Sequence, residues 1–431
     1  MDPRVDRWLF AFAIGAWCVA IAWQLAIPMT LQHDEAAYVV GARRWLDGAP
    51  NVWLYRSLGT ELLVLPGVAA NASPSWMRVL PALSTLVVPF GAWALARAAF
   101  PDRAVGGWAA ALLVTSHPIA IRVAEILGDL PAAGLLLVGL AILLREIERP
   151  SWKLALAAAA LGAGFYVRYG STPALVAIGV ATPLFFWRWR SLAILAAALG
   201  VFAIPFVWFS HEQTGATLGV LEVASRSTKL DYVGQGLVTY VTSNPLAYFG
   251  VLVAPAMLLG VVGTFALRDR RALYLGAIAI GALVLLGLRS HAQPRYAFFV
   301  VCVLVVVGVA QLARILASRP RAQRIAALAI ALAGGVTVVW AAVTRPSRSV
   351  HPAQIAQLAE AIRHDAAGQP CRIVAPRISQ LVYYSGCKDA KWPDAATAGP
   401  IYFVSLGDLT VEAPPEAVPV EGVSGVVRIA D

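Results

Sequence analysis

Two adjacent carboxylates, Asp34 and Glu35, follow the first long apolar stretch of the chain. Charged groups beside a bilayer are costly unless they stay hydrated or serve a function. A partly desolvated carboxylate gains basicity, which is what a general base requires. The pair therefore predicts a base that a membrane protein presents to a substrate arriving from one side. The competing interpretation is that Asp34 caps a helix starting at Glu35 or Ala36, because a carboxylate there bonds free backbone N–H groups.

Asp129 is the second candidate for catalysis, in the run Gly128-Asp129-Leu130-Pro131 at the outer start of an apolar segment. An aspartate before Leu-Pro is also a good helix cap. Catalysis and capping therefore both stay open for Asp129. Glu125, four residues earlier, is its weaker partner.

Basic residues recur at the ends of the apolar segments. A guanidinium binds phosphate or carboxylate through paired N–H groups, and such cations stabilise the charge that develops on a departing phosphate. A single arginine more commonly extends toward the lipid headgroups. The presence of several cations at the ends of these segments is what favours an anion-binding site. Its members are Arg56, Arg168, Arg289, His291 and Arg295.

The elements that must position these residues are membrane spans. Of the 431 residues, 59% are hydrophobic and 13% are charged, whereas a soluble protein carries about a quarter charged residues. Because a hydrocarbon core takes roughly 20 helical residues, the apolar runs predict a polytopic α-helical membrane protein with about 11 spans. The first run has no small-residue cleavage site and is expected to be a retained helix. The predicted spans lie near 8–28, 78–99, 104–119, 130–145, 153–168, 172–187, 191–210, 246–267, 272–288, 296–314 and 325–343.

Lysine and arginine are distributed unevenly between alternate connections. With a cytoplasmic N-terminus, the inner segments hold 16 basic and six acidic residues. The outer loops hold ten and nine, and the tail from Arg345 holds eight and nine. The formal net charge of +10 therefore falls on the cytoplasmic side, as the positive-inside rule requires, and it gives no evidence for nucleic-acid binding. An odd number of spans places the C-terminus and all the candidate residues on the outer side.

The chain divides into a predicted transmembrane module, residues 1–344, and a small soluble α/β domain, residues 345–431. The module has a long first outer loop at 29–77 and a fourth outer loop at 211–245. Within the first, residues 58–70 are apolar but short and contain Pro66, which favours a re-entrant or interfacial helix. The tail shows helical spacing at 352–366 and β-like runs at 371–375, 400–404 and 425–429.

The chain has four cysteines. Cys18 and Cys302 lie in apolar segments and are expected to be inert. Cys371 and Cys387 lie in the tail, where an oxidising compartment allows a disulfide. Two free thiols are the alternative, and the independently derived topology favours the disulfide.

The order of these motifs resembles the C-type glycosyltransferase superfamily, particularly bacterial members similar to protein O-mannosyltransferases and to lipid A aminoarabinose transferases. The resemblance covers residues 8–315 and depends on short motifs in order rather than on an extended signature. The motifs are Asp34-Glu35-Ala36-Ala37-Tyr38, Tyr55-Arg56, Arg78-Val79-Leu80-Pro81-Ala82-Leu83, Ala96-Arg97-Ala98-Ala99-Phe100, Gly128-Asp129-Leu130-Pro131-Ala132-Ala133, Val167-Arg168-Tyr169 and Pro294-Arg295-Tyr296.

The resemblance implies a role for each matching residue. Asp34 would be the base that deprotonates the acceptor hydroxyl, with Glu35 beside it, and Asp129 would be the second acid. Arg56 would contact the donor phosphate, although Arg56-Ser57 stands where Lys-Pro is usual, and Arg295 would do so with Tyr296. Donors in the family are sugars on polyprenyl phosphate, and the reaction inverts the anomeric carbon. The chain is short for the family and has no Asp-x-Asp motif, so no cofactor is predicted and a divalent metal stays an open alternative.

These observations predict a glycosyltransferase of the bacterial inner membrane that moves a sugar from polyprenyl phosphate to a lipid, glycan or protein acceptor at the outer face. A transporter or flippase for lipid-linked glycans is the rival, but it would place charges at mid-membrane depth and often show paired halves. A non-catalytic glycolipid-binding subunit is the third interpretation, which holds if the acidic residues are only caps.

Overall fold

A computed structural model describes the chain except at residues 50–52, 55, 227–229, 346–349, 376–377, 390–398, 407–410, 422 and 430–431. Tyr55 of the predicted Tyr55-Arg56 motif therefore lies outside the described residues. Spatial contacts between residues group the chain into two compact units, each made of three separate segments. Unit 1 comprises Met1–Leu25, Leu54–Thr60 and Val79–Val343, and unit 2 comprises Ala26–Trp53, Glu61–Arg78 and Thr344–Asp431.

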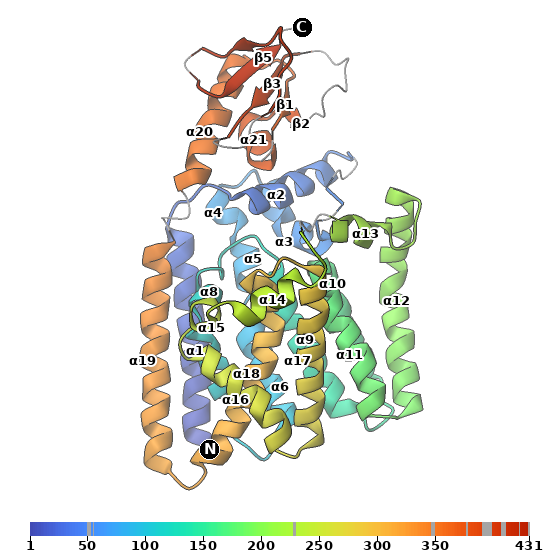
Figure 1. Cartoon of the computed structure of the whole chain (residues 1–431), viewed down its shortest axis with the longest axis vertical. Helices are drawn as coiled ribbons and strands as arrows, with labels where there is room; N and C mark the ends of the chain where they lie inside the picture. The colour runs from blue at the N-terminus through green and yellow to red at the C-terminus, as the bar shows by residue number, and fades with distance from the viewer. Residues whose placement is uncertain are drawn as a thin grey trace. The chain divides into compact units, whose positions relative to one another are not determined.

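Unit 1 is a bundle of helices (Figure 1). Its apolar residues form one continuous core that includes helices from both ends of the unit. In chain order the helices are α1 (Pro3–Ala26), α5 (Val79–Ser84), α6 (Val87–Ala99), α7 (Gly106–Val114), α8 (His117–Ala120), α9 (Asp129–Glu146), α10 (Lys153–Val167), η1 (Tyr169–Ser171), α11 (Thr172–Phe185), α12 (Trp189–Thr214), α13 (Gly219–Arg226), α14 (Gln235–Thr242), α15 (Pro245–Phe249), α16 (Val253–Ala266), α17 (Arg270–Arg289), η2 (Pro294–Ala297), α18 (Phe298–Leu316) and α19 (Pro320–Thr344).

Helices of the structure lie in every predicted span, although those at 104–119 and 246–267 are each divided into two helices. The predicted class of polytopic membrane protein is confirmed. Six stretches among the described residues are helical, long and apolar enough to cross a membrane: Pro3–Ala26, Pro74–Ala99, Trp189–Thr214, Arg270–Arg289, Pro294–Leu316 and Pro320–Thr344. The number of about 11 spans stays a prediction. Val201, Ile204 and Trp208 of α12 are exposed, as expected of a helix whose surface faces lipid.

Close helix contacts in the bundle depend on small residues, as is usual where helices pack without a hydrophobic driving force. The best example is the pair α16 and α18. A Cβ on Gly260 would lie 2.1 Å from the carbonyl oxygen of Leu304, and one on Gly308 would lie 2.0 Å from that of Ala256. These glycines set how closely α18, which directly follows η2 and the candidate Arg295, packs in the bundle.

Unit 2 combines the first connecting segment with the tail. It contains α2 (His33–Leu46), most of α3 (Leu58–Ala69), α4 (Pro74–Met77), α20 (Val350–Asp365) and α21 (Ile378–Ser385). The predicted short helix containing Pro66 is α3, and Pro66 lies inside it. Where the soluble domain begins, predicted at residue 345, stays a prediction.

The tail contains a mixed sheet of five strands in the order β2-β1-β3-β5-β4. β1 pairs in parallel with β2 and β3, whereas β5 pairs antiparallel with β3 and β4. Three of these strands correspond to the predicted β-like runs, and α20 corresponds to the predicted helix. The strands are β1 (Arg372–Val374), β2 (Lys388–Asp389), β3 (Ile401–Val404), β4 (Val418–Pro419) and β5 (Val426–Ile429).

Cys371 and Cys387 form a disulfide in the structure, with an S–S distance of 2.06 Å. It connects the residue before β1 with the residue before β2, so it closes a loop that contains β1 and α21. Cys18 and Cys302 are free cysteines, the former exposed and the latter buried.

Candidate active site

Asp34 lies in the first turn of α2 and is half-buried. The N-cap of this helix is Gln32, so the interpretation in which Asp34 caps the helix is wrong. Asp34 is instead the second residue of the helix, with its neighbours His33 and Glu35 both engaged by other parts of unit 2. The same correction applies to Asp129, because the N-cap of α9 is Gly128 and Asp129 is the first helical residue.

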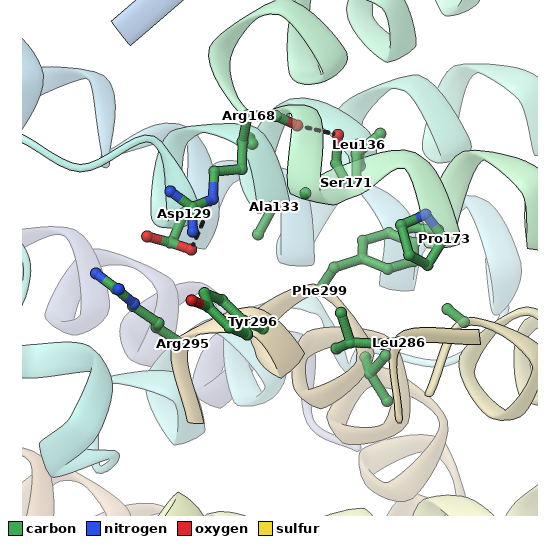
Figure 2. A pocket seen from close by; sticks show the side chains of 15 residues that line it. Asp129, Ala133, Leu136, Arg168, Ser171, Pro173, Leu286, Arg295, Tyr296 and Phe299 are labelled. Atoms are coloured by element: carbon green, nitrogen blue, oxygen red, sulfur yellow. Dashed lines mark hydrogen bonds and ion pairs between the residues drawn. The ribbon is translucent and has the colours of Figure 1, made fainter. Parts of the chain in front are cut away.

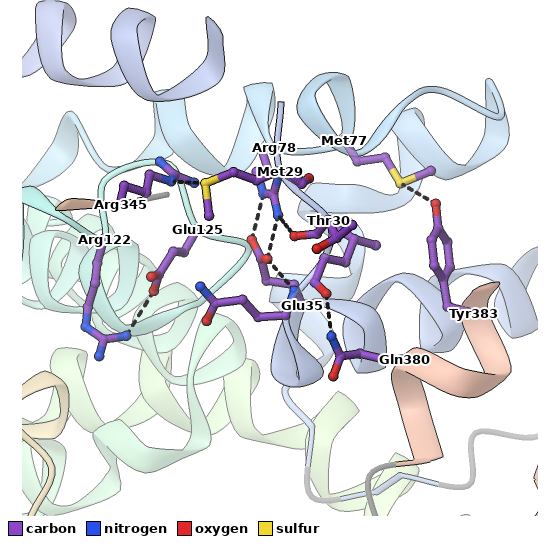
Figure 3. Close-up of polar contacts among 12 residues, drawn as sticks. Met29, Thr30, Glu35, Met77, Arg78, Arg122, Glu125, Arg345, Gln380 and Tyr383 are labelled. Carbon is purple, nitrogen blue, oxygen red and sulfur yellow. Dashed lines mark hydrogen bonds and ion pairs between the residues drawn. The ribbon is translucent and has the colours of Figure 1, made fainter. Parts of the chain in front are cut away.

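Glu35 forms a bidentate ion pair with Arg78, and both side chains are fully buried. Arg78 donates from Nε to Oε1 at 2.8 Å and from one terminal nitrogen to Oε2 at 2.7 Å (Figure 3). It also donates to the carbonyl oxygens of Met29 and Thr30, each at 2.9 Å. Oε2 of Glu35 accepts the N–H of Gln32 as well, at 2.8 Å. With both oxygens occupied in this way, Glu35 is suited to supporting the turn that holds Asp34 rather than to accepting a proton.

Arg78 is a residue that the sequence reasoning placed in a motif but not in the site. Its position at the predicted outer end of a predicted span was the available signal, since a basic residue there runs against the charge rule. The structure shows that its task is to neutralise Glu35 and to hold the chain that leads into α2.

The second cluster lies in unit 1, around a cavity lined by the start of α9, the α10–α11 connection and η2 (Figure 2). Nε of Arg168 is 3.1 Å from Oδ1 of Asp129. The guanidinium groups of Arg168 and Arg295 both lie over the ring of Tyr296, with their central carbons 5.4 and 5.3 Å from its centroid. Two cations and one carboxylate leave this cavity with a net positive charge, which suits an anion.

Asp129 has one oxygen to spare. Its side chain is 4% exposed, and Oδ2 is buried without a hydrogen-bond partner among the described residues. A buried carboxylate oxygen without a partner is costly. A ligand with a hydroxyl or another N–H or O–H donor in the cavity would satisfy it.

Three segments of unit 1 meet where Asp129 and Arg168 are placed. The hydroxyl of Thr60 donates to the carbonyl of Val167 at 2.7 Å, and the N–H of Tyr169 donates to Oγ of Ser57 at 2.9 Å. A Cβ on Gly128 would lie 2.2 Å from the Val167 oxygen and 2.5 Å from the Thr60 oxygen. The glycine before Asp129 is therefore required by close packing, and this junction fixes the two ends of the Asp129–Arg168 pair.

The loop before η2 positions Arg295 through Gln293. The Gln293 amide oxygen accepts from Nε of Arg295 at 2.6 Å, and its nitrogen lies 2.8 Å from Nε2 of His291. Since an amide nitrogen can only donate, Nε2 of His291 is the acceptor in this contact. The hydroxyl of Tyr240 donates to the Gln293 carbonyl at 3.1 Å, and that of Tyr248 donates to the Ala292 carbonyl.

Tyr240 belongs to the segment predicted as the fourth outer loop, 211–245, and Tyr248 belongs to the predicted span near 246–267. Burial raises the pKa of the Tyr240 hydroxyl, and the nearby Tyr248 adds to the shift. Tyr240 therefore stays protonated and keeps donating to the backbone of the loop before η2. Neither these tyrosines nor Gln293 was predicted, and only the position of Gln293 between His291 and Arg295 gave a signal.

Two of the predicted phosphate-binding arginines do not line this cavity. Arg289 is exposed at the end of α17 and does not line the cavity. Arg56 is buried next to Ser57, at the junction that supports Arg168. Glu125, the predicted partner of Asp129, instead pairs with Arg122 at 2.9 Å. Among the residues with described positions, no group of three or more His, Cys, Asp or Glu side chains is arranged to hold a metal ion.

No family model matches the chain, and no curated protein matches it in sequence. Solved structures do match its fold. The fold is that of the C-type glycosyltransferases, which confirms the resemblance seen in the motifs.

Within that class, the chain is similar over nearly its whole length to ArnT, the lipid A aminoarabinose transferase, from Cupriavidus metallidurans. The apo structure of ArnT gives a TM-score of 0.73 at 14% identity, covering 98% of this chain and 97% of that one. ArnT bound to undecaprenyl phosphate gives 0.70 at 14% identity, covering 98% of each. The Archaeoglobus fulgidus oligosaccharyltransferase tethered with an acceptor peptide gives 0.61 at 13% identity, covering 89% of this chain and 63% of that one. This likeness establishes the fold.

Proposed function

We propose that the chain is a membrane glycosyltransferase that moves a sugar from polyprenyl phosphate to an acceptor hydroxyl at the extracytoplasmic face of the inner membrane. The observation that carries the proposal is the cavity in which Arg168 and Arg295 share the ring of Tyr296 beside the buried Asp129. The fold adds support, because an ArnT structure with that fold holds undecaprenyl phosphate.

The donor phosphate binds at the two guanidinium groups. Arg168 pairs with Asp129, and Nε of Arg295 donates to the neutral amide of Gln293, so both guanidinium groups are held in place at the cavity. As the bond between the anomeric carbon and the phosphate oxygen breaks, negative charge grows on the leaving polyprenyl phosphate. Fixed cations beside that oxygen stabilise the transition state more than the ground state.

Asp34 takes the proton from the acceptor hydroxyl. The hydroxyl oxygen attacks the anomeric carbon from the side opposite the phosphate, so the new bond forms as the old one breaks and the configuration inverts. Glu35 does not compete for the proton, because Arg78 and the N–H of Gln32 occupy its oxygens. Oδ2 of Asp129, which has no hydrogen-bond partner among the described residues, accepts a hydrogen bond from a sugar hydroxyl. This bond orients the donor.

The proposed topology has a cytoplasmic N-terminus and the tail, residues 345–431, outside, where the Cys371–Cys387 disulfide is stable. The transmembrane module is residues 1–344. The acceptor is a lipid, a glycan or a protein, and the proposed step uses no cofactor.

The test is sugar transfer by purified protein in lipid nanodiscs, with a panel of undecaprenyl-phosphate sugars, followed by release of undecaprenyl phosphate. Asp34→Asn and Arg295→Ala should each lower kcat/KM at least about 100-fold. Arg321→Ala removes an exposed arginine at the start of α19 and should leave the rate unchanged. A wild-type protein that moves the intact glycolipid across the bilayer without releasing polyprenyl phosphate would be a flippase, and the proposal would be wrong.

A further inference from the structure

The N-terminal turn of α2, which carries Asp34, is held by side chains from α21, about 350 residues later in the chain. Nε2 of Gln380 donates to the carbonyl oxygen of Leu31 at 2.7 Å. The N–H of Leu31 donates to the hydroxyl of Tyr384, also at 2.7 Å. Both backbone polar groups of Leu31, a fully buried residue, therefore depend on α21.

Ser379 holds the residue next to Asp34. Its Oγ lies 2.8 Å from the carbonyl oxygen of His33 and 2.8 Å from Nδ1 of the same residue. A hydroxyl has one proton, so Ser379 donates to the carbonyl and accepts from Nδ1–H. Ser379 is 2% exposed and Gln380 is 1% exposed, so water does not compete for these bonds.

A second contact connects the tail with the other end of α2. Arg44, in the last turn of the helix, forms an ion pair with Asp389 of β2. The disulfide between Cys371 and Cys387 closes the loop that carries α21, next to the strand that carries Asp389. The tail thus holds α2 at both ends, which determines the direction of the helix and the place of its first turn.

We propose that Ser379 and Gln380 are positioning residues for Asp34, so that the C-terminal tail is a working part of the active site. The inference deepens the function proposed above and rests on it. Residues 31–33 are held by α21, and Glu35 is held by Arg78, so the backbone on both sides of Asp34 is fixed by side chains. A base must lie within hydrogen-bond reach of the proton it takes, and a displacement of about 1 Å can cost about 100-fold in rate.

Each test variant changes a contact between α21 and residues 31–33. Gln380→Glu keeps the shape but places a carboxylate against the Leu31 carbonyl, and Ser379→Ala removes the hydroxyl. Ser379→Thr restores a hydroxyl and serves as the rescue. Ser385→Ala is the matched control, since it removes two buried bonds at the end of α21, to the Leu381 carbonyl and from the Cys387 N–H, without touching residues 31–33.

Three measurements are made on the full-length protein in nanodiscs: kcat and KM for sugar transfer, Kd for undecaprenyl phosphate, and amide hydrogen exchange in the peptide covering residues 29–36. Gln380→Glu and Ser379→Ala should lower kcat about 10–100-fold, leave Kd within about twofold, and speed exchange at residues 31–34. Ser379→Thr should recover most of the rate, and Ser385→Ala should match the wild type.

The inference is overturned if the wild type transfers sugar and Asp34→Asn does not, while Gln380→Glu and Ser379→Ala keep the wild-type kcat. It is also overturned if both variants bind the lipid phosphate as poorly as they turn over, because that would indicate general damage. A wild type that transfers no sugar would instead refute the proposed function, and the positioning role with it.

Discussion

Oδ1 of Asp129 lies 3.1 Å from Nε of Arg168, while Oδ2 of the same carboxylate is buried without a hydrogen-bond partner among the described residues. One oxygen thus pairs with Arg168, a proposed phosphate-binding cation, and the other faces a cavity in which a ligand could reach it. The arrangement exists because Gly128 lets the start of α9 approach Thr60 and Val167 more closely than any other residue would.

Asp129→Asn should separate phosphate binding from sugar transfer. The amide keeps the shape of the side chain but removes the negative charge that Asp129 places beside Arg168, so the cavity gains positive charge. We expect undecaprenyl phosphate to bind as tightly as to the wild type or more tightly, while kcat falls at least about tenfold. Calorimetric binding and a transfer assay at the same ionic strength measure the two effects. Glu148→Gln makes the same change of charge at an exposed site, and a loss of lipid binding in Asp129→Asn alone would contradict the expectation.

Gln293 should control how Arg295 binds the phosphate of the donor. Gln293→Ala removes the acceptor of the Arg295 Nε–H and should weaken undecaprenyl phosphate binding about tenfold. Gln293→Glu should weaken it further, because a carboxylate neutralises the cation. Titrations of the lipid phosphate provide the measurement, with Gln235→Ala as control, since that amide contacts the exposed Asp231. Equal affinities for Gln293→Ala and Gln293→Glu would argue against an electrostatic role.

The Glu35–Arg78 pair should matter for folding as much as for catalysis. Removing one member of a buried ion pair leaves the other charge uncompensated, at a typical cost of about 3–5 kcal/mol in the free energy of unfolding. Arg78→Met and Glu35→Gln should each lower the melting temperature and yield of the protein. In the double variant the loss should be smaller than the sum of the single losses, because no uncompensated charge remains. Additive losses would show that the two side chains act independently.

The disulfide should stabilise the tail. Cys371 and Cys387 are 16 residues apart, and closing a loop of that size typically contributes about 3 kcal/mol. The Cys371→Ser and Cys387→Ser double variant should therefore melt at a lower temperature, and reductant should lower the melting temperature of the wild type only. A variant as stable as the oxidised wild type would refute this, and Cys18→Ser, which changes an exposed free cysteine, is the control.

Local sequence carried much of the prediction of the fold. The apolar runs are long enough to be unfavourable in water, and in lipid a chain must satisfy its backbone hydrogen bonds internally. The predicted spans therefore coincide with helices. The β-like runs around Ile373, Tyr402 and Val427 became the three central strands, because alternating apolar residues in a short tail form a sheet. The two outer strands, Lys388–Asp389 and Val418–Pro419, were missed. They are too short to show an alternation of apolar and polar residues, and they form only by pairing with a neighbouring strand.

Some of the predicted site residues lie together in the structure, and others do not. Asp129, Arg168, Arg295 and Tyr296 were expected from motifs in order, and the structure places them around one cavity. Arg289 has the same residue type and nearly the same position as Arg295, but it is exposed at the end of α17. Nothing in the local sequence distinguishes the two, because the difference lies in the turn of the chain between them.

The sequence alone determined the class of protein, the candidate carboxylates and the basic residues near them, because hydropathy and residue type are local properties. Only the tertiary structure decided which partner each charge has. Arg78 pairs with Glu35 across 43 positions, and Gln380 holds Leu31 across 349 positions. Such contacts depend on how distant segments pack, and hydrogen bonds form only where that packing brings a donor within about 3 Å of an acceptor.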